Sequence, residues 1–203
     1  MSVPPERLAR WMAGFAERHG PTSLTSAPEQ VVLQAQDGAR AELEVSFPPL
    51  LGEGPDAVVG HALRERRVGV LLVRLGGHAC GVVEGRTLVA SKVGSRQVHG
   101  RSAAGGQSQQ RFARRREGQV RVALQAAADN AFRILVPEAA GLEAVVVGGE
   151  RTAVDAVLAD RRLAALVPLV TGRLLDVPDP RLRVLQTAPD LLRAVHIRVV
   201  DPD

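Results

Sequence analysis

The sequence is poor in the residues that most often stabilise small folds or carry chemistry. Only 2% of its 203 residues are aromatic and tyrosine is absent, so a core must consist of Val, Leu and Ala. Cys80 is the only cysteine, which excludes an internal disulfide and favours a reducing compartment. No apolar run approaches the ~20 residues that span a bilayer, and the first residues lack the pattern of a secretion signal. We therefore expect a cytoplasmic protein without a membrane contact.

Lysine is almost absent, and acidic residues are missing from one region. Lys92 is the only lysine, so arginine supplies nearly all of the basic charge. Between Arg86 and Arg121 there are nine basic residues and one acid, Glu117, a net excess of eight, whereas the whole chain carries +4. The rest of the chain is therefore net acidic. A positive field concentrated on one segment is typical of contact with nucleic acid.

The hydrophobic pattern predicts a mixture of helices and antiparallel strands. Apolar residues at helical spacing from Leu8 to Phe15 predict an N-terminal helix, and Asp37-Gly38 predicts a hairpin turn. The other predicted elements are strands at 30–36, 39–46, 68–75, 78–84, 86–93, 145–147 and 195–199, loops at 48–56 and 94–106, and a helix of about 25 residues from Gln107. This order indicates an α+β fold, a mixed sheet with packed helices.

The length of 203 residues suits one large domain or two small ones, and a single domain over residues 1–203 is the simplest interpretation. The sequence shows neither an internal repeat nor a low-complexity linker. Within this domain, residues 1–66 are expected to form a lobe of one helix and one hairpin. Residues 67–203 are expected to hold the sheet, the polar loop and the remaining helices.

The common catalytic and metal-binding patterns are missing. His78 and Cys80 are the only close pair of metal-ligating residues, and two ligands do not complete a zinc shell. The sequence has no Gly-x-Ser-x-Gly elbow and no pair of carboxylates suited to acid–base catalysis. Gly52-x-Gly54-x-x-Ala57 is similar to a dinucleotide fingerprint, but it follows Pro48-Pro49 and not a strand. We therefore predict no metal and no cofactor.

The segment from Gly94 to Arg116 is the strongest candidate for a functional site. It contains Gly105-Gly106-Gln107-Ser108, followed by Arg111, Arg114, Arg115 and Arg116. Adjacent glycines give the backbone conformational freedom, and the basic residues behind them suit phosphate groups. The pattern predicts a tip that enters a site lined by RNA.

Two motifs in this segment resemble those of release factors. Gly105-Gly106-Gln107-Ser108, with Arg111-Phe112-Ala113-Arg114 after it and His99-Gly100-Arg101 before it, resembles the tip of the central domain of eukaryotic and archaeal class-1 peptide chain release factors. Lys92-x-Gly94-x-x-Gln97 resembles a pattern of the Vms-like release factors of ribosome rescue, in particular an actinobacterial branch of peptidyl-tRNA hydrolases. The likeness over residues 67–200 lies in the order of elements and is looser.

The resemblance implies a release-factor central-domain-like (RNase H-like) fold and hydrolysis of peptidyl-tRNA on stalled or split ribosomes. It implies that Gly105, Gly106 and Gln107 are catalytic, with Gln97 and Gly94 from the second pattern. We favour Gln107, because two adjacent glycines precede it. A neutral glutamine can position water and needs no matched pKa. The implied RNA-binding residues are Arg96, Arg101, Arg111, Arg114, Arg115 and Arg116.

The implied partners are the rRNA of the large ribosomal subunit and peptidyl-tRNA, and we expect a monomer. Two other functions stay open. The chain would be a non-catalytic RNA-binding module if the loop were only an anchor, although an anchor needs cations more than glycines. It would be a ribonuclease if it cut the tRNA acceptor end, and the residues do not separate this reaction from ester hydrolysis.

Overall fold

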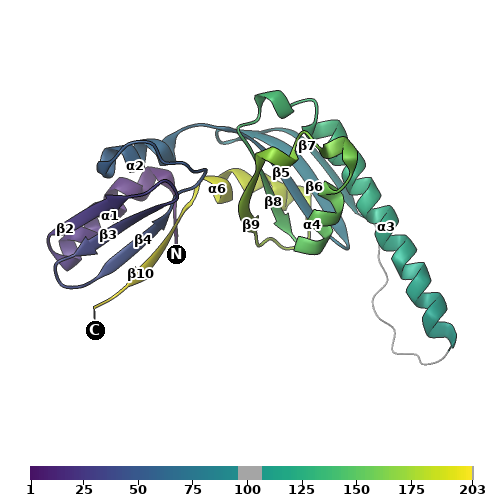
Figure 1. Cartoon of the computed structure of the whole chain (residues 1–203), viewed down its shortest axis with the longest axis horizontal. Coiled ribbons are helices and arrows are strands. Elements are labelled where there is room, and N and C mark those ends of the chain that lie inside the picture. The colour runs from purple at the N-terminus through teal and green to yellow at the C-terminus, as the bar shows by residue number, and fades with distance from the viewer. Residues whose placement is uncertain (96–106, 203) are drawn as a thin grey trace. The chain divides into compact units, whose positions relative to one another are not determined.

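The computed structural model describes residues 1–95 and 107–202, with the side chains of residues 107–113 left out (Figure 1). The chain divides into two compact units, one of Met1–Glu65 with Pro189–Asp203 and one of Arg66–Ala188. The first boundary lies beside the lobe boundary expected from the sequence. That the whole chain folds as one domain stays a prediction.

The first unit contains a five-stranded antiparallel sheet together with helices. Within the described residues, the order of its strands is β1 (Ser2–Val3), β10 (Val195–Val200), β4 (Arg40–Glu44), β3 (Gln30–Ala35) and β2 (Thr22–Ser26). Its helices are α1 (Pro5–His19), α2 (Gly54–Leu63) and α6 (Ala188–Arg193), the last of which begins at the boundary between the units. The predicted turn at Asp37-Gly38 is confirmed: Gly38 has φ 99°, and the Asp37 carboxylate accepts a hydrogen bond from the Ala39 backbone N–H at 2.9 Å.

The second unit holds a mixed sheet. Within the described residues, its strand order is β7 (Thr87–Ser95), β6 (Gly77–Glu84), β5 (Arg67–Arg74), β8 (Ala144–Gly149) and β9 (Val170–Leu175). The first three strands form an antiparallel meander, while β8 and β9 add in parallel. The helices of the second unit are α3 (Gln107–Leu135), α4 (Arg151–Leu158) and α5 (Leu182–Gln186), and 3-10 turns lie at Ala139–Gly141, Arg161–Leu163 and Val167–Leu169.

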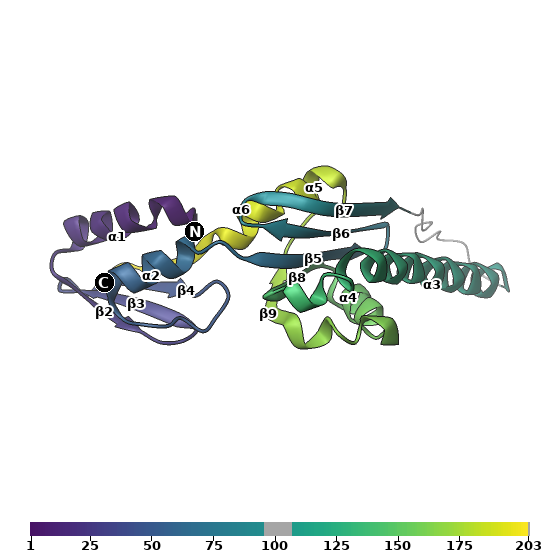
Figure 2. The ribbon, with the colours of Figure 1, turned by 90° about the horizontal axis from the view of Figure 1, so that it is seen from above.

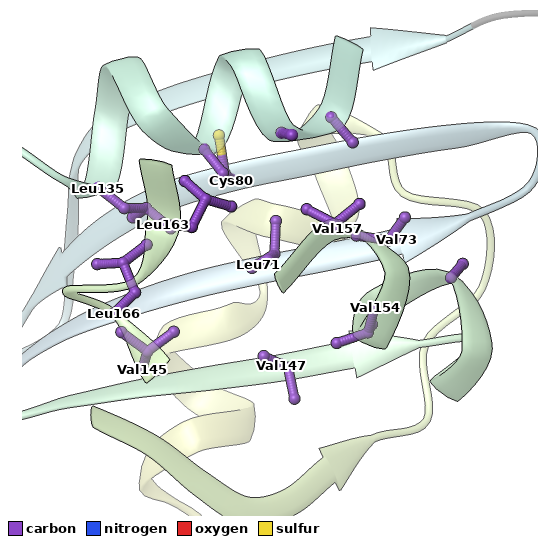
Figure 3. Packing of buried hydrophobic residues seen from close by; sticks show 14 of the residues in the cluster. Leu71, Val73, Cys80, Leu135, Val145, Val147, Val154, Val157, Leu163 and Leu166 are labelled. Carbon is purple, nitrogen blue, oxygen red and sulfur yellow. The ribbon is translucent and has the colours of Figure 1, made fainter. Parts of the chain in front are cut away.

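Helices cover both faces of this second sheet. Figure 2 shows α3 and α4 on one face and α5 on the other. Figure 3 shows the aliphatic layer between the sheet and α3 and α4, in which Leu71 and Cys80 of the strands face Val157 of α4 and Leu135 of α3. Small residues of α3 let the helix approach the sheet closely, and these are Ala127, Ala128 and Ala131. Close packing of aliphatic side chains therefore replaces the missing aromatics.

The α+β fold class is confirmed, with one correction to the arrangement. The sequence led us to expect one mixed sheet closed by a strand at 195–199. That strand exists as β10, but it pairs with β4 and β1 in the sheet of the first unit. The alternating pattern of Val195 and Ile197 predicts a half-buried strand, whereas the identity of its neighbour depends on distant residues.

Candidate functional site

The site expected from the sequence is bracketed by one strand and one helix. Gly94 lies next to the last residue of β7, and Gln107 is the first residue of α3. Five predicted site residues lie outside the described residues: Arg96, Gln97, Arg101, Gly105 and Gly106.

The helix that begins at Gln107 is long and only partly packed. Its 29 residues correspond to a length of about 43 Å at 1.5 Å per residue. Among residues 114–135, the first buried one is Ala127, which lies about 30 Å along the axis from Gln107. Figures 1 and 2 both show α3 extending past the ends of the strands. The helix thus holds its first residue away from the packed sheet.

The predicted arginines lie in the part of α3 before this packed region. Arg114 and Arg115 are exposed and Arg116 is half-buried, while the side chain of Arg111 lies outside the described part. The first turn of α3 contains no acidic residue. The partial positive charge of a helix N-terminus adds to the charge of the arginines. This end of α3 therefore suits anionic oxygens such as those of phosphate groups.

A groove of about 750 Å³ runs beside the middle of α3, between this helix and α4. Its lining is Leu75, Arg116, Glu117, Val120, Arg121, Leu124, Gln125, Ala128, Ala156, Ala159 and Asp160. Most of the lining surface is apolar. Arg116 lines this groove and is less exposed than Arg114 and Arg115.

His78 and Cys80 lie on one face of β6, as their spacing predicts, and the structure shows that both are buried. Burial raises the pKa of the Cys80 thiol to about 12, so the thiol stays protonated and unreactive at neutral pH. Within the described residues, no group of three His, Cys, Asp or Glu side chains could hold a metal ion. The same residues include no helix with the length and apolarity to cross a membrane.

Asn130 is a polar residue of the site region that sequence reasoning missed. Its Nδ2 lies 2.7 Å from His78 Nε2, a contact between residues 52 positions apart. Asn130 is half-buried, and its place between the buried Ala127 and Ala131 was the available signal, since a polar group that loses contact with water needs a partner. The partner itself does not follow from the pattern.

A family model of release factors matches the whole of the second unit and continues into β10. The model is that of the Actinobacteria/chloroflexi VLRF1 release factor, and it matches residues 66–198. These residues are more than half of the chain, so the chain is a release-factor-like protein. It belongs to the Actinobacteria/chloroflexi VLRF1 release factor family. The resemblance seen in the sequence is thereby confirmed at the level of the family.

Three solved structures are similar at low identity. The archaeal translation termination factor aRF1 is 17% identical with a TM-score of 0.47, and the match covers 91% of this chain and 61% of that one. An archaeal protein is 16% identical with a TM-score of 0.45 and coverages of 92% and 62%. The Vms1 mitochondrial localization core is 10% identical with a TM-score of 0.47 and coverages of 98% and 82%. No curated protein matches the chain.

Proposed function

We propose that this chain is a peptidyl-tRNA hydrolase that frees nascent peptides from tRNA on stalled or split ribosomes. The observation that carries the proposal is the position of Gln107 at the start of α3, directly after Gly105-Gly106 and four positions before Arg111, the first of the clustered arginines. Membership in a release-factor family supports the assignment to translation. The chain spans 61% of the length of the archaeal factor, so the proposed activity and partners rest on the residues of this chain.

The reaction needs little chemistry from the protein. The ester between peptide and tRNA is already activated, so a catalyst must position one water and stabilise the oxyanion that develops on the carbonyl. In our proposal the Gln107 side chain orders the water, since its amide both donates and accepts hydrogen bonds. The backbone N–H groups at the start of α3 are free donors that suit the oxyanion. Gly105 and Gly106 give the backbone freedom to bring Gln107 to the ester.

The shape of α3 suits a narrow RNA-lined site. Its first residue, Gln107, is held about 30 Å along the helix from the buried Ala127. In our proposal Gln107 therefore reaches the ester inside the narrow site, while the sheet stays outside that site. We propose that Arg111, Arg114, Arg115 and Arg116 bind phosphates of large-subunit rRNA and tRNA along this path. Arg96 and Arg101 would add to the same contacts. We also propose that the protein acts in the cytoplasm as a monomer and uses no cofactor.

The test is release of peptide from peptidyl-tRNA on isolated large subunits, with Gln107→Ala and Gln97→Ala compared. We expect Gln107→Ala to slow release on the order of 10²-fold, as for the loss of one oxyanion-site donor. Its affinity for the subunit should not change, because a neutral side chain is lost. Gln97→Ala is the matched control and should keep the wild-type rate. The reverse result would move the catalytic role to Gln97 and to the pattern that includes Gly94.

Analysis of the tRNA 3′ end in the same reaction separates the alternatives. An intact CCA end with free peptide is the expected product. A shortened end would identify a ribonuclease. If the wild-type chain binds the subunit but releases no peptide, the proposed hydrolase activity is refuted. The chain would then be a non-catalytic RNA-binding module.

A further inference from the structure

We propose that His78 is a positioning residue, which sets the end of β7 against α3 and so determines where the reactive glutamine is held. This inference rests on the proposed function. Both candidate glutamines, Gln97 and Gln107, lie between Gly94 and the body of α3 in sequence. The buried imidazole of His78 contacts the elements on both sides of that segment.

The first contact is with Gly94. His78 of β6 and Gly94 of β7 are direct cross-strand partners, so a side chain at position 94 would lie on the same face as the imidazole. A Cβ added to Gly94 would lie 2.4 Å from His78 Cε1 and 2.5 Å from His78 Nε2. The ring therefore fills the space that any larger residue at position 94 would need, so the end of β7 and the ring are packed directly against each other.

The second contact is with α3. Asn130 Nδ2 lies 2.7 Å from His78 Nε2. An amide N–H donates, so Nε2 accepts, and the neutral ring carries its proton on Nδ1. His78 is 5% exposed, and burial lowers its pKa, which favours this neutral form. One ring thus fixes both the end of β7 and the rotation of α3.

Because α3 is long, a small tilt of the helix at the contact between His78 and Asn130 produces a large displacement of Gln107. Asn130 lies about 35 Å along the helix from Gln107. At that distance a tilt of about 2° moves the start of the helix by about 1 Å. A misplacement of about 1 Å is enough to slow a reaction about 10²-fold. The contact between His78 and Asn130 therefore acts on reaction geometry and not only on stability.

The test is a set of double-mutant measurements on the full chain, with Gly94→Ala, His78→Ala and the double variant. The maximal rate of peptide release and the affinity for large subunits are measured separately, at a temperature where each variant is folded. We expect Gly94→Ala to lower the maximal rate about 10²-fold with unchanged affinity, because its Cβ displaces the ring. In the His78→Ala background the ring is gone, so Gly94→Ala should cause no further loss. Asn130→Ala, which removes only the amide contact, should also lower the rate without changing affinity.

Gly148→Ala is the matched control. A Cβ at Gly148 would lie 2.9 Å from Leu175 Cβ and from Leu72 Cδ2, so it crowds the same sheet away from β7. This variant should keep the wild-type rate of release. An equal loss in Gly148→Ala, or losses from Gly94→Ala and His78→Ala that simply add, would overturn the inference while release by the wild type still stands. A wild-type chain that releases no peptide would refute the proposed function itself.

Discussion

Residues 107–121 and residues 124–135 belong to one continuous helix, yet they differ in charge and in burial. The first part carries most of the arginines, with Arg114 and Arg115 exposed. The second part buries an alanine-rich stripe against the sheet, with Ala131 and Leu135 fully covered. Arg, Gln and Ala all favour helix, so the backbone runs on through both parts. Helical propensity decides that α3 is long, and the side chains decide which part packs and which part is free to bind.

The largest expected difference between the two parts of α3 is in the free energy of unfolding, to which the packed part, residues 124–135, should contribute most. Leu135 is 0% exposed in the aliphatic core, so Leu135→Ala should lower the free energy of unfolding by about 2–5 kcal/mol. Arg115→Ala, in the exposed part, should change it by less than about 0.5 kcal/mol. Thermal or urea unfolding of both variants measures the difference. Equal losses would mean that the exposed part of α3 also supports the fold.

A smaller expected effect is on the salt dependence of RNA binding, to which the exposed part of α3, residues 107–121, should contribute. Replacing Arg114 and Arg115 together with Ala should flatten the slope of log affinity against log salt by about two units, if each side chain neutralises one phosphate. Arg133→Ala is the control, because Arg133 is an exposed arginine in the packed part of the same helix. Binding to large subunits at several salt concentrations gives the slopes. A slope that changes for Arg133→Ala but not for the double variant would place the RNA surface elsewhere.

The smallest expected effect is a dependence of the free energy of unfolding on pH, caused by the titration of His78. Burial lowers the pKa of His78 below its ordinary 6.5 in the folded chain, so just below pH 6.5 the unfolded chain binds more protons than the folded one. The free energy of unfolding should therefore fall as the pH drops from 6.5 toward the lowered pKa. The residues paired with His78 are neutral, namely Val73, Gly94 and Asn130. His78→Phe keeps a ring and removes the titrating group, so its stability should vary less with pH over this range.

Much of the fold follows from local patterns in the sequence. The N-terminal helix, the hairpin at Asp37-Gly38, the three-stranded meander and the long helix from Gln107 all lie where the pattern predicts them. The main omission is α2, because Gly52, Gly54 and Pro55 are typical of a loop. In the structure Pro55 lies in the first turn of that helix, where a missing N–H costs nothing. The strand β9 was also missed, since its residues are only partly buried and show no clear alternation.

The sequence by itself determined the α+β class, the basic segment around α3 and the Gly-Gly-Gln motif that points to a release factor. These features depend on residues close together in the chain, where propensity, periodicity and charge act directly. Only the tertiary structure decided that β10 joins the first sheet, that the imidazole of His78 fills the space above Gly94 and that Asn130 meets it. It also decided where the packed part of α3 begins. Each of these depends on contacts between distant residues, and a local pattern can require a partner without specifying which one.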